Sequence, residues 1–522
     1  MIDIIFQHHY CYKTHFAEKQ KLTLYLLLFF GMHLFFLETI SAQEKKEIVI
    51  LNAEELRMAK VNNLSARLLK GNVKLQQDDV ILNCDSALFY NDINAVDAFG
   101  NVHIVQKETN IYADSLKHNG DTKTSILYGD VRLVNPQMQL TTNLLAYYID
   151  EKKGIYTTGG KIVNAEKTLT SEIGYYYPET NMAYFRGNVN LTSTEYQLIA
   201  DTLVFNTATE ISYFNGPTTI INKENTIVCQ KGFFDSKNDY SEFGINTIMY
   251  NKEQILKTDS LQYSNNTGNG KIFKYFNWAD TTSNIVLEGT TADFLNRGNN
   301  IVATNNPMLV YIIEGDSLFV SGDTLKSITD TLTNITIFFC YYKVKFYKSN
   351  LQGKCDSLYF SYSDSIIRMF VEPVIWSEEN QLSGDTIYLF MKNQKIDRFE
   401  MFENGFMINY LKLAFYNQVK GRKITGYFEN DELERMDVDG NAESLYYAED
   451  AQKAMIGANK AIGSEMKILM KDKEVNRIIF YKQPEATFYP IQKTSPSELQ
   501  LKNFNWQPQF RPLNKEGVFS NK

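Results

Sequence analysis

The sequence predicts an all-β protein, an elongated β-jellyroll or β-solenoid of stacked units about 29 residues long. Three observations carry this prediction. A glycine motif recurs at a fixed interval, a short polar landmark recurs between the glycines, and apolar residues alternate with polar ones at every second position. Period-two alternation is typical of strands, and a fixed interval of this length is typical of repeat folds.

The glycine motif marks one corner of each unit. Gly-Asn-Val stands at residues 71–73, 100–102 and 187–189, and Gly-Asp-Val stands at 129–131. Successive glycines are 29 residues apart (100 − 71 = 29; 129 − 100 = 29), and Gly159, Gly216 and Gly244 continue the series. Glycine adopts positive φ at little cost, so we expect the chain to turn at each of these positions.

An aspartate marks a second corner. Asp85, Asp114, Asp201 and Asp259, each followed by Ser or Thr, are separated by 29 residues or multiples of 29 (114 − 85 = 29; 201 − 114 = 87; 259 − 201 = 58). Apolar residues lie at offsets −3 and −1 before the aspartate, and at +2 and +4 after it. A strand changes the parity of its inward face only at a bend, so we interpret Asp-Ser/Thr as a bend whose side chains bond the local backbone.

Two columns of apolar residues follow from this register, and we take them as candidates for an apolar interior. The aliphatic column, three residues before the aspartate, contains Leu82, Ile111, Leu140, Leu169, Leu198, Ile227 and Leu256. The ring column, four residues after it, contains Phe89, His118, Tyr147, Tyr176, Phe205, Phe234 and Tyr263. Identical positions should form ladders about 4.8 Å apart if each unit adds one rung. The sequence leaves open whether this interior is a filled core or an open groove.

The N-terminal segment has the pattern of an export signal. Lys19 and Lys21 precede an apolar run from Leu22 to Leu37, and small residues end at Ala42. We predict a signal peptide at residues 1–42, with an uncleaved membrane anchor as the alternative. Residues 43–70 follow as a leader segment, which we interpret either as a leader strand or as a flexible connection.

The repeats divide the remaining chain. We expect regular repeats at residues 71–280 and a second, less regular roll at 281–481, with a boundary between about 280 and 300. The stretch from Lys326 to Leu351 lacks the aspartate, so we interpret it as an insertion or as irregular rungs. Residues 482–522 hold five of the ten prolines, which favours an extended or flexible tail over central strands.

The sequence predicts no catalytic, metal or cofactor site. After the expected signal only His103 and His118 remain, and no calcium, phosphate-binding or dinucleotide motif is present. The four cysteines after the signal are interpreted as small core residues: Cys84, Cys229, Cys340 and Cys355. The net charge of −8 argues against a nucleic-acid partner, which would need a basic face.

The motifs resemble those of one known family. Leu-x-Gly-Asn-Val-x-Leu at residues 69–75 and Ile-x-Ala-Asp-Ser-Leu-x-His at 111–118 are similar to the OstA-like and LptA-like family of organic-solvent-tolerance and lipopolysaccharide-transport proteins. The resemblance covers residues 69–265 clearly and extends more weakly to about 480. It implies a V-shaped β-jellyroll that shields the acyl chains of lipopolysaccharide or lipid A in the periplasm. It also implies edge strands that join other transport components or further copies of the chain.

These considerations predict a periplasmic, non-enzymatic lipid carrier, associated with the inner or the outer membrane. The thirteen aliphatic and aromatic members of the two columns would then line its groove. Two alternatives stay open at this point. One is a structural or adhesive surface solenoid, which would have a closed, dry core. The other is a polysaccharide-active β-helix enzyme, which would need a cluster of carboxylates that the motif spacing does not offer.

Overall fold

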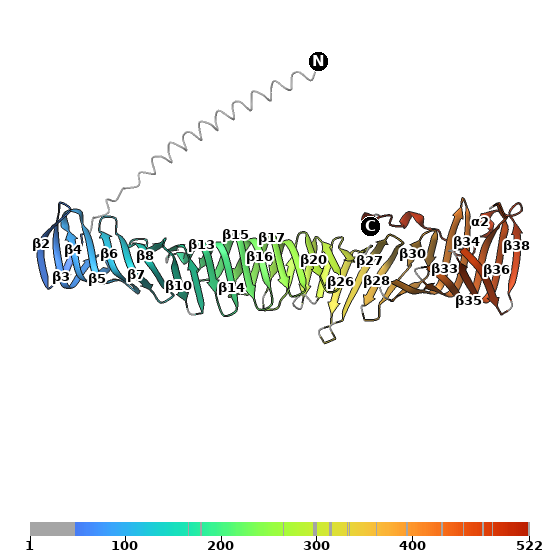
Figure 1. Cartoon of the computed structure of the whole chain (residues 1–522), viewed down its shortest axis with the longest axis horizontal. Coiled ribbons are helices and arrows are strands. Elements are labelled where there is room, and N and C mark those ends of the chain that lie inside the picture. Colours follow the sequence, from blue (N-terminus) through green and yellow to red (C-terminus); the bar gives the residue numbers. More distant parts are fainter. Residues whose placement is uncertain are drawn as a thin grey trace, which may run out of the picture.

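In the computed structural model the chain forms one elongated array of strands (Figure 1). The structure describes residues 47–519 except 165, 178–179, 265, 296–299, 313–315, 331, 334, 362, 393–394, 430–431, 453, 472–473 and 483. The expected signal peptide lies outside these residues. The described chain contains 38 strands joined in a single antiparallel system, which confirms the prediction of an all-β stacked roll.

The first half of the array consists mainly of strands 10 to 14 residues long, some of them split in two at a bend. Their bounds are β1 Val49–Asn52, β2 Glu55–Val61, β3 Leu64–Gln77, β4 Val80–Tyr90, β5 Ala95–Gln106, β6 Thr109–Asn119, β7 Thr124–Val134, β8 Gln139–Tyr148, β9 Lys153–Tyr156, β10 Gly160–Asn164, β11 Lys167–Ser171, β12 Ile173–Tyr177, β13 Met182–Thr192, β14 Tyr196–Asn206, β15 Ile211–Asn222, β16 Thr226–Asp235, β17 Tyr240–Asn251, β18 Gln254–Tyr263, β19 Gly270–Ile272 and β20 Phe276–Asp280.

Each long strand bends once near its middle, where its pairing shifts register. In the pairing of β4 with β5 the shift lies between Asn83 and Ser86, and the same interruption recurs in the following pairs. The bends divide the array into two arms. Arm A contains residues 80–84 of β4, 102–106 of β5 and 109–113 of β6, together with the equivalent half of each later strand. Arm B contains residues 86–90 of β4, 95–99 of β5 and 115–119 of β6, with their equivalents. The inward residues of both arms are buried, so the two arms enclose a core between them.

The glycine and aspartate corners form a single ridge, which corrects the expectation that they mark two separate corners. Gly100 and Asn101 both have positive φ, at 75° and 46°, and they lie against Asp85 of the neighbouring strand. The Asn101 side chain donates a hydrogen bond of 2.9 Å to the Asp85 carboxylate. The aspartate thus bonds the next strand rather than its local backbone. Antiparallel pairing of consecutive strands is the reason, because it places the middle of one strand beside the middle of the next.

Glutamate replaces the aspartate at two positions of this ridge. Glu172, at a position where the aspartate is missing, accepts a hydrogen bond of 2.6 Å from Asn188 and lies beside Gly187. Glu54 likewise accepts a hydrogen bond of 2.5 Å from Asn72 and lies beside Gly71. At these positions a carboxylate lies opposite a left-handed residue pair, and either acidic side chain supplies it.

The aliphatic column is part of a longer ladder across the sheet. Leu82 pairs with Ile104, Ile104 with Ile111, and Ile111 with Leu133. Each unit contributes two antiparallel strands, so identical positions recur on every second strand, about 9.6 Å apart. This corrects the expected ladder spacing of 4.8 Å. The residues of the Gly-Asn-Val-x-Leu motif fill the intervening places.

The second half continues the same array without a break. β20 pairs with β21, and β21 pairs with β24, across the expected boundary near residue 280. The bounds are β21 Ile285–Gly289, β22 Thr291–Leu295, β23 Asn300–Thr304, β24 Met308–Tyr311, β25 Leu318–Ser321, β26 Thr324–Thr329, β27 Thr336–Lys348, β28 Leu351–Ser361, β29 Ile366–Phe370, β30 Val374–Ser377, β31 Asn380–Ser383, β32 Thr386–Lys392, β33 Lys395–Lys412, β34 Phe415–Glu429, β35 Glu432–Glu449, β36 Met455–Lys471, β37 Glu474–Tyr481 and β38 Glu485–Pro490.

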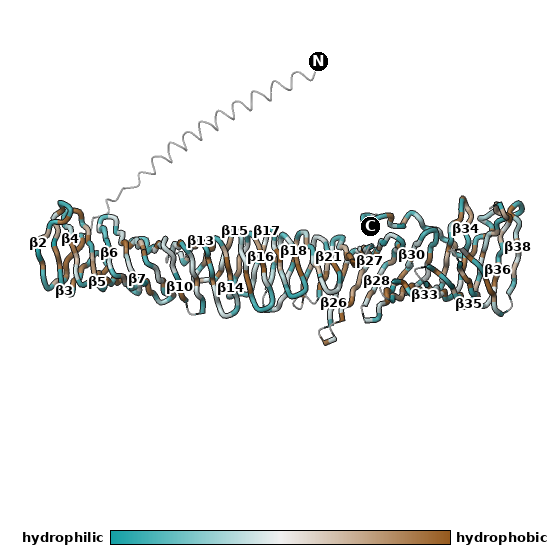
Figure 2. Tube along the Cα trace, viewed as in Figure 1, coloured by the Kyte–Doolittle hydropathy of each residue, from teal (hydrophilic) through white to brown (hydrophobic). Residues whose placement is uncertain are grey.

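The stretch between Lys326 and Leu351 keeps the bend although it lacks the landmark residues. β27 pairs regularly with β26 and β28, and its bend falls at Tyr342 and Lys343, whose φ angles are 61° and 53°. Towards the C-terminus the strands lengthen to between 15 and 18 residues in β33 to β36 (Figure 1). Apolar and polar residues alternate along the strands of the whole array (Figure 2).

The proline-containing tail lies against the outer face of arm A in the second half. It passes through the short helices α2 (Pro496–Leu499), η3 (Pro508–Phe510) and η4 (Glu516–Phe519). Leu499 and Leu501 are buried against outward-facing residues of β33 and β35, including Phe406, Ile408 and Leu445. Because the tail covers apolar side chains, burial favours this docked arrangement over a detached one.

The ridge gives a first prediction. Gly100→Ala should destabilise the protein by about 2 kcal/mol, because alanine resists positive φ and its Cβ would meet the Asp85 carboxylate. An added Cβ at Gly100 would lie 2.4 Å from Asp85 Oδ2. Urea unfolding followed by circular dichroism measures the change. Gly244→Ala is the matched control, since its nearest contact would be an ordinary 3.6 Å. Equal effects of the two substitutions would contradict the role of the ridge.

Candidate functional site

The interior between the two arms is the candidate site, and rings alternate with small residues along arm B. Tyr147 pairs with Ser125 on one side and with Gly154 on the other. Phe205 likewise lies between Ala183 and Ser212. The small residues on the neighbouring strands make room for the rings, so each ring can lie across the strands beside it.

The thirteen groove candidates all face this interior. Each of them is less than one-tenth exposed: Leu82, Ile111, Leu140, Leu169, Leu198, Ile227, Leu256, Phe89, Tyr147, Tyr176, Phe205, Phe234 and Tyr263. The structure thus brings all of them together in one continuous core. Whether they also line a lipid groove stays a prediction.

The two arms meet again on the side opposite the ridge, along a line that we call the seam. Here the strand ends of arm A contact the ring column of arm B. His118 Nε2 donates to Gln77 Oε1 at 2.9 Å, and the Ser125 hydroxyl lies 2.9 Å from the other ring nitrogen. One unit later, the Tyr147 hydroxyl donates to Gln106 Oε1 at 2.8 Å. These contacts close the open side of the V.

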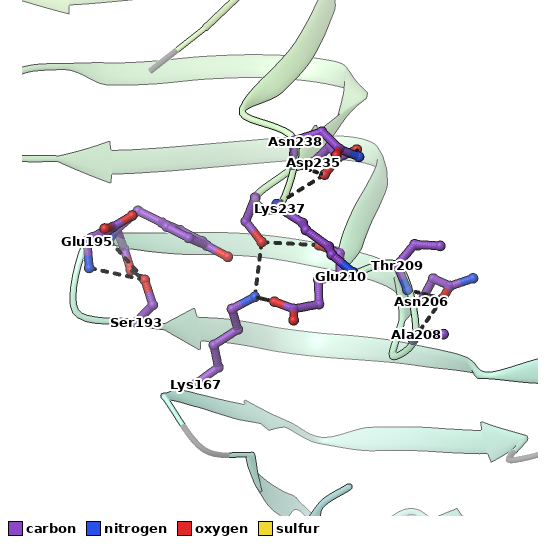
Figure 3. Close-up of polar contacts among 12 residues, drawn as sticks. Lys167, Ser193, Glu195, Asn206, Ala208, Thr209, Glu210, Asp235, Lys237 and Asn238 are labelled. Atoms are coloured by element: carbon purple, nitrogen blue, oxygen red, sulfur yellow. Dashed lines mark hydrogen bonds and ion pairs between the residues drawn. The ribbon is translucent and has the colours of Figure 1, made fainter. Parts of the chain in front are cut away.

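Charged and polar pairs continue the seam. Lys123 lies 2.8 Å from Asp78, and Asn225 donates to the Tyr263 hydroxyl at 2.9 Å. Lys167, at the start of β11, reaches across to Glu210 and to Ser236 (Figure 3). Every one of these links is non-covalent. The seam is therefore the side on which the roll can open without breaking backbone hydrogen bonds within a sheet.

The seam residues of arm A were missed at the sequence level. Gln77, Gln106 and Asn135 are 29 residues apart (106 − 77 = 29; 135 − 106 = 29), as are Ser125, Gly154 and Ala183 of the small column (154 − 125 = 29; 183 − 154 = 29). The same register that located the rings contains both columns. Their period alone could have located them, but the period does not show that the ends of arm A lie against arm B.

The interior is filled rather than hollow in its first half. Three cavities of about 40, 30 and 20 Å³ lie along it, bordered by seam residues such as Asn225, Lys167 and Gln77. A volume of this size holds one or a few water molecules, far less than an acyl chain. A long apolar ligand therefore requires the arms to separate.

The cysteines behave as core residues, as predicted. All four are buried. Burial raises the pKa of the Cys84 thiol to about 11 and that of Cys229 to about 12, so both thiols stay protonated at neutral pH. Thiols in this state are poor nucleophiles.

Two further findings concern the described residues alone. Within them, no cluster of three or more His, Cys, Asp or Glu side chains is placed to hold a metal ion. No helix in the same part of the chain is long and apolar enough to cross a membrane.

A comparison with protein families identifies the first part of the roll. The family model described as OstA-like protein matches residues 45–201, which is 157 of the 522 residues (201 − 45 + 1 = 157). Residues 45–201 belong to the OstA-like family. The match spans β1 to the ridge position of β14, and confirms the resemblance drawn from the repeats. No curated protein matches the chain. At the level of the family, the OstA-like segment indicates a role in lipid or lipopolysaccharide transport rather than in catalysis.

The seam of this OstA-like segment gives a prediction about pH. Burial lowers the pKa of His118 to about 4, against 6.5 ordinarily. Between these values the unfolded chain binds a proton that the folded chain does not. Stability should therefore fall as the pH drops from 6.5 to 4, by up to about 3 kcal/mol at about 1.4 kcal/mol per pH unit.

His118→Tyr tests this prediction, because Tyr147 makes the equivalent bond one unit later. The variant should lose less stability than the parent between pH 6.5 and 4, measured as the difference between their urea midpoints. Parallel curves would mean that His118 is protonated in the folded protein and that its burial is wrongly assigned.

Proposed function

We propose that this protein is a non-enzymatic carrier in the periplasm that shields the acyl chains of lipopolysaccharide or lipid A between the two arms of its roll. The single observation that carries the proposal is the continuous apolar interior of an OstA-like roll, closed on one side only by polar side-chain contacts. The roll thus combines an apolar interior with one side that can open by breaking side-chain contacts alone. The pattern of Lys19, Lys21 and the following apolar run supports export.

The C-terminal half supports the same function, because its interior is less enclosed. The long strands β34 to β36, and β37 beside them, add an inner row of apolar side chains at the ends of arm B, which contains Phe428, Leu433, Met470 and Val475. These four residues are only partly buried, whereas the ring column of the first half is buried. An acyl chain that enters here would therefore disrupt fewer side-chain contacts than one that enters beside Tyr147.

The ends of the roll suit partners that add strands. In the part of the chain that the structure describes, β2 pairs only with β3, and β37 and β38 pair only with β36. On β2, Leu56 and Met58 are 53% and 73% exposed. Unpaired edges with apolar side chains favour strand addition. Another transport component, or a second copy of the chain, is the partner that this chemistry fits.

Mass spectrometry of lipid bound to the full chain, purified from its own envelope, is the first test. Stoichiometric lipopolysaccharide or lipid A is the expected result. Protein that is free of lipid, and that also fails to take up added lipopolysaccharide, would favour the structural or adhesive solenoid instead. The packed interior of the first half is the observation that keeps this second candidate open.

A crosslink across the seam tests the route of the lipid. Cysteines at Asp78 with Lys123, and at Lys167 with Glu210, would each be joined by a short bis-maleimide, because these seam side chains are partly exposed. The native cysteines are buried, so the reagent should spare them. Linking both pairs should abolish most uptake of lipopolysaccharide from micelles, because the arms can no longer part.

The matched control links Glu242 to Gln262, which are neighbours on the outer face of arm B and lie 2.9 Å apart. This link joins two strands of one sheet and leaves the seam free, so uptake should persist. Undiminished uptake by the seam-linked protein would show that lipid binds elsewhere.

A further inference from the structure

The outer face of arm B contains a hollow that the proposed carrier function does not use. It lies over β27, β28 and β29, has a volume of about 480 Å³, and is bordered by Phe339, Tyr341, Ser357, Tyr359, Arg368 and Phe370. Volumes between about 300 and 1,000 Å³ are typical of small-molecule sites. The three interior cavities described above have volumes of about 40, 30 and 20 Å³. This hollow is therefore the roomier place for a ligand in the structure as it stands.

Strand register explains the shape of the hollow. Ser357 pairs with Tyr341 on one side and with Phe370 on the other. A small side chain thus stands between two rings that lie two strands apart, about 9.6 Å. The next row contains Phe339, Tyr359 and Arg368 in register. These side chains point outwards, because the intervening Cys340, Leu358 and Met369 are buried in the core.

The walls of the hollow are held in place by their neighbours. The rings of Phe339 and Tyr341 are nearly parallel, with centroids 5.8 Å apart, and Phe339 meets Tyr359 edge to face at 5.2 Å. Arg368 lies over the Tyr359 ring at 5.1 Å and is bound to Asp364 at 2.6 Å. Preorganised side chains lose little conformational entropy when a ligand binds.

We propose that this hollow is a glycan-binding site in which a sugar ring stacks between Tyr341 and Phe370. Aromatic rings suit the C–H face of a pyranose, and Ser357 stands in register between two of them, Tyr341 and Phe370. The hydroxyls of Tyr341 and Tyr359 and the guanidinium of Arg368 border the hollow and can bond sugar hydroxyls, whereas the Ser357 hydroxyl donates to Asp356 at 2.8 Å and is left as an acceptor. Arg368 pairs with Asp364, so the positive charge of its guanidinium is balanced. This balance favours a polar, uncharged ligand over a phosphate.

The site is independent of lipid in the interior, so its test uses water-soluble oligosaccharides only. Saturation-transfer difference NMR would be recorded on the full chain with the oligosaccharides released by mild acid from the envelope of the producing cell. The expected result is saturation transfer to sugar ring protons in the parent protein. This transfer should be lost in the double variant that carries both Tyr341→Ala and Phe370→Ala. Ser357→Gln should also abolish it, by filling the space between the rings while leaving both rings in place.

The matched control replaces Tyr184 and Tyr213 with alanine. Both are outward-facing rings of the first half and are 42% exposed, and they lie far from the hollow in the sequence. This variant should keep the transfer signal. Absence of transfer to any sugar, or equal transfer in the parent and in Ser357→Gln, would overturn the proposal. Either result leaves the lipid-carrier proposal unaffected.

Discussion

The contact between a left-handed residue pair and a carboxylate on the next strand is the constraint on which the rest of the structure depends. At Gly100 and Asn101 the backbone takes two positive φ angles in succession, and Asp85 fills the space that a Cβ would occupy. This bend turns one long strand into two arms. Repeated on consecutive strands, it lines up into a ridge, and the ridge fixes which side chains of each arm face inwards. Without it, period-two alternation would place the residues before and after the bend on opposite faces of one flat sheet.

The two sides of the V are held by different chemistry, and this difference matters for function. The ridge is continuous backbone, so separating the arms there would require breaking the chain. The seam consists of side-chain hydrogen bonds and ion pairs, such as His118 with Gln77 and Lys123 with Asp78. A hydrogen bond of this kind contributes only about 1 kcal/mol net. The carrier function that we propose would therefore use the ridge as a hinge and the seam as the side that opens.

The outer faces have separate roles along the chain. In the second half, the outer face of arm A is covered by the chain's own tail, where Trp506 stacks on Tyr410 at 6.1 Å. The outer face of arm B in the same region is uncovered and presents the hollow between Tyr341 and Phe370. The sheet of arm B separates the interior from this hollow, so the two binding sites that we propose would act independently.

The sequence by itself determined the fold class, the unit length and the inward set of residues. Spacing and alternation are local properties, so the repeat register alone is enough to place Leu82, Tyr147 and the other column members inside the roll. Tertiary structure alone decided three things. Pairing between strands brought the glycine and aspartate corners together, and it put Gln77 against His118, 41 residues apart. It also docked the tail on Phe406 and Ile408. These contacts depend on which strands are neighbours and on how the arms close, and neither is encoded in the period of a single strand.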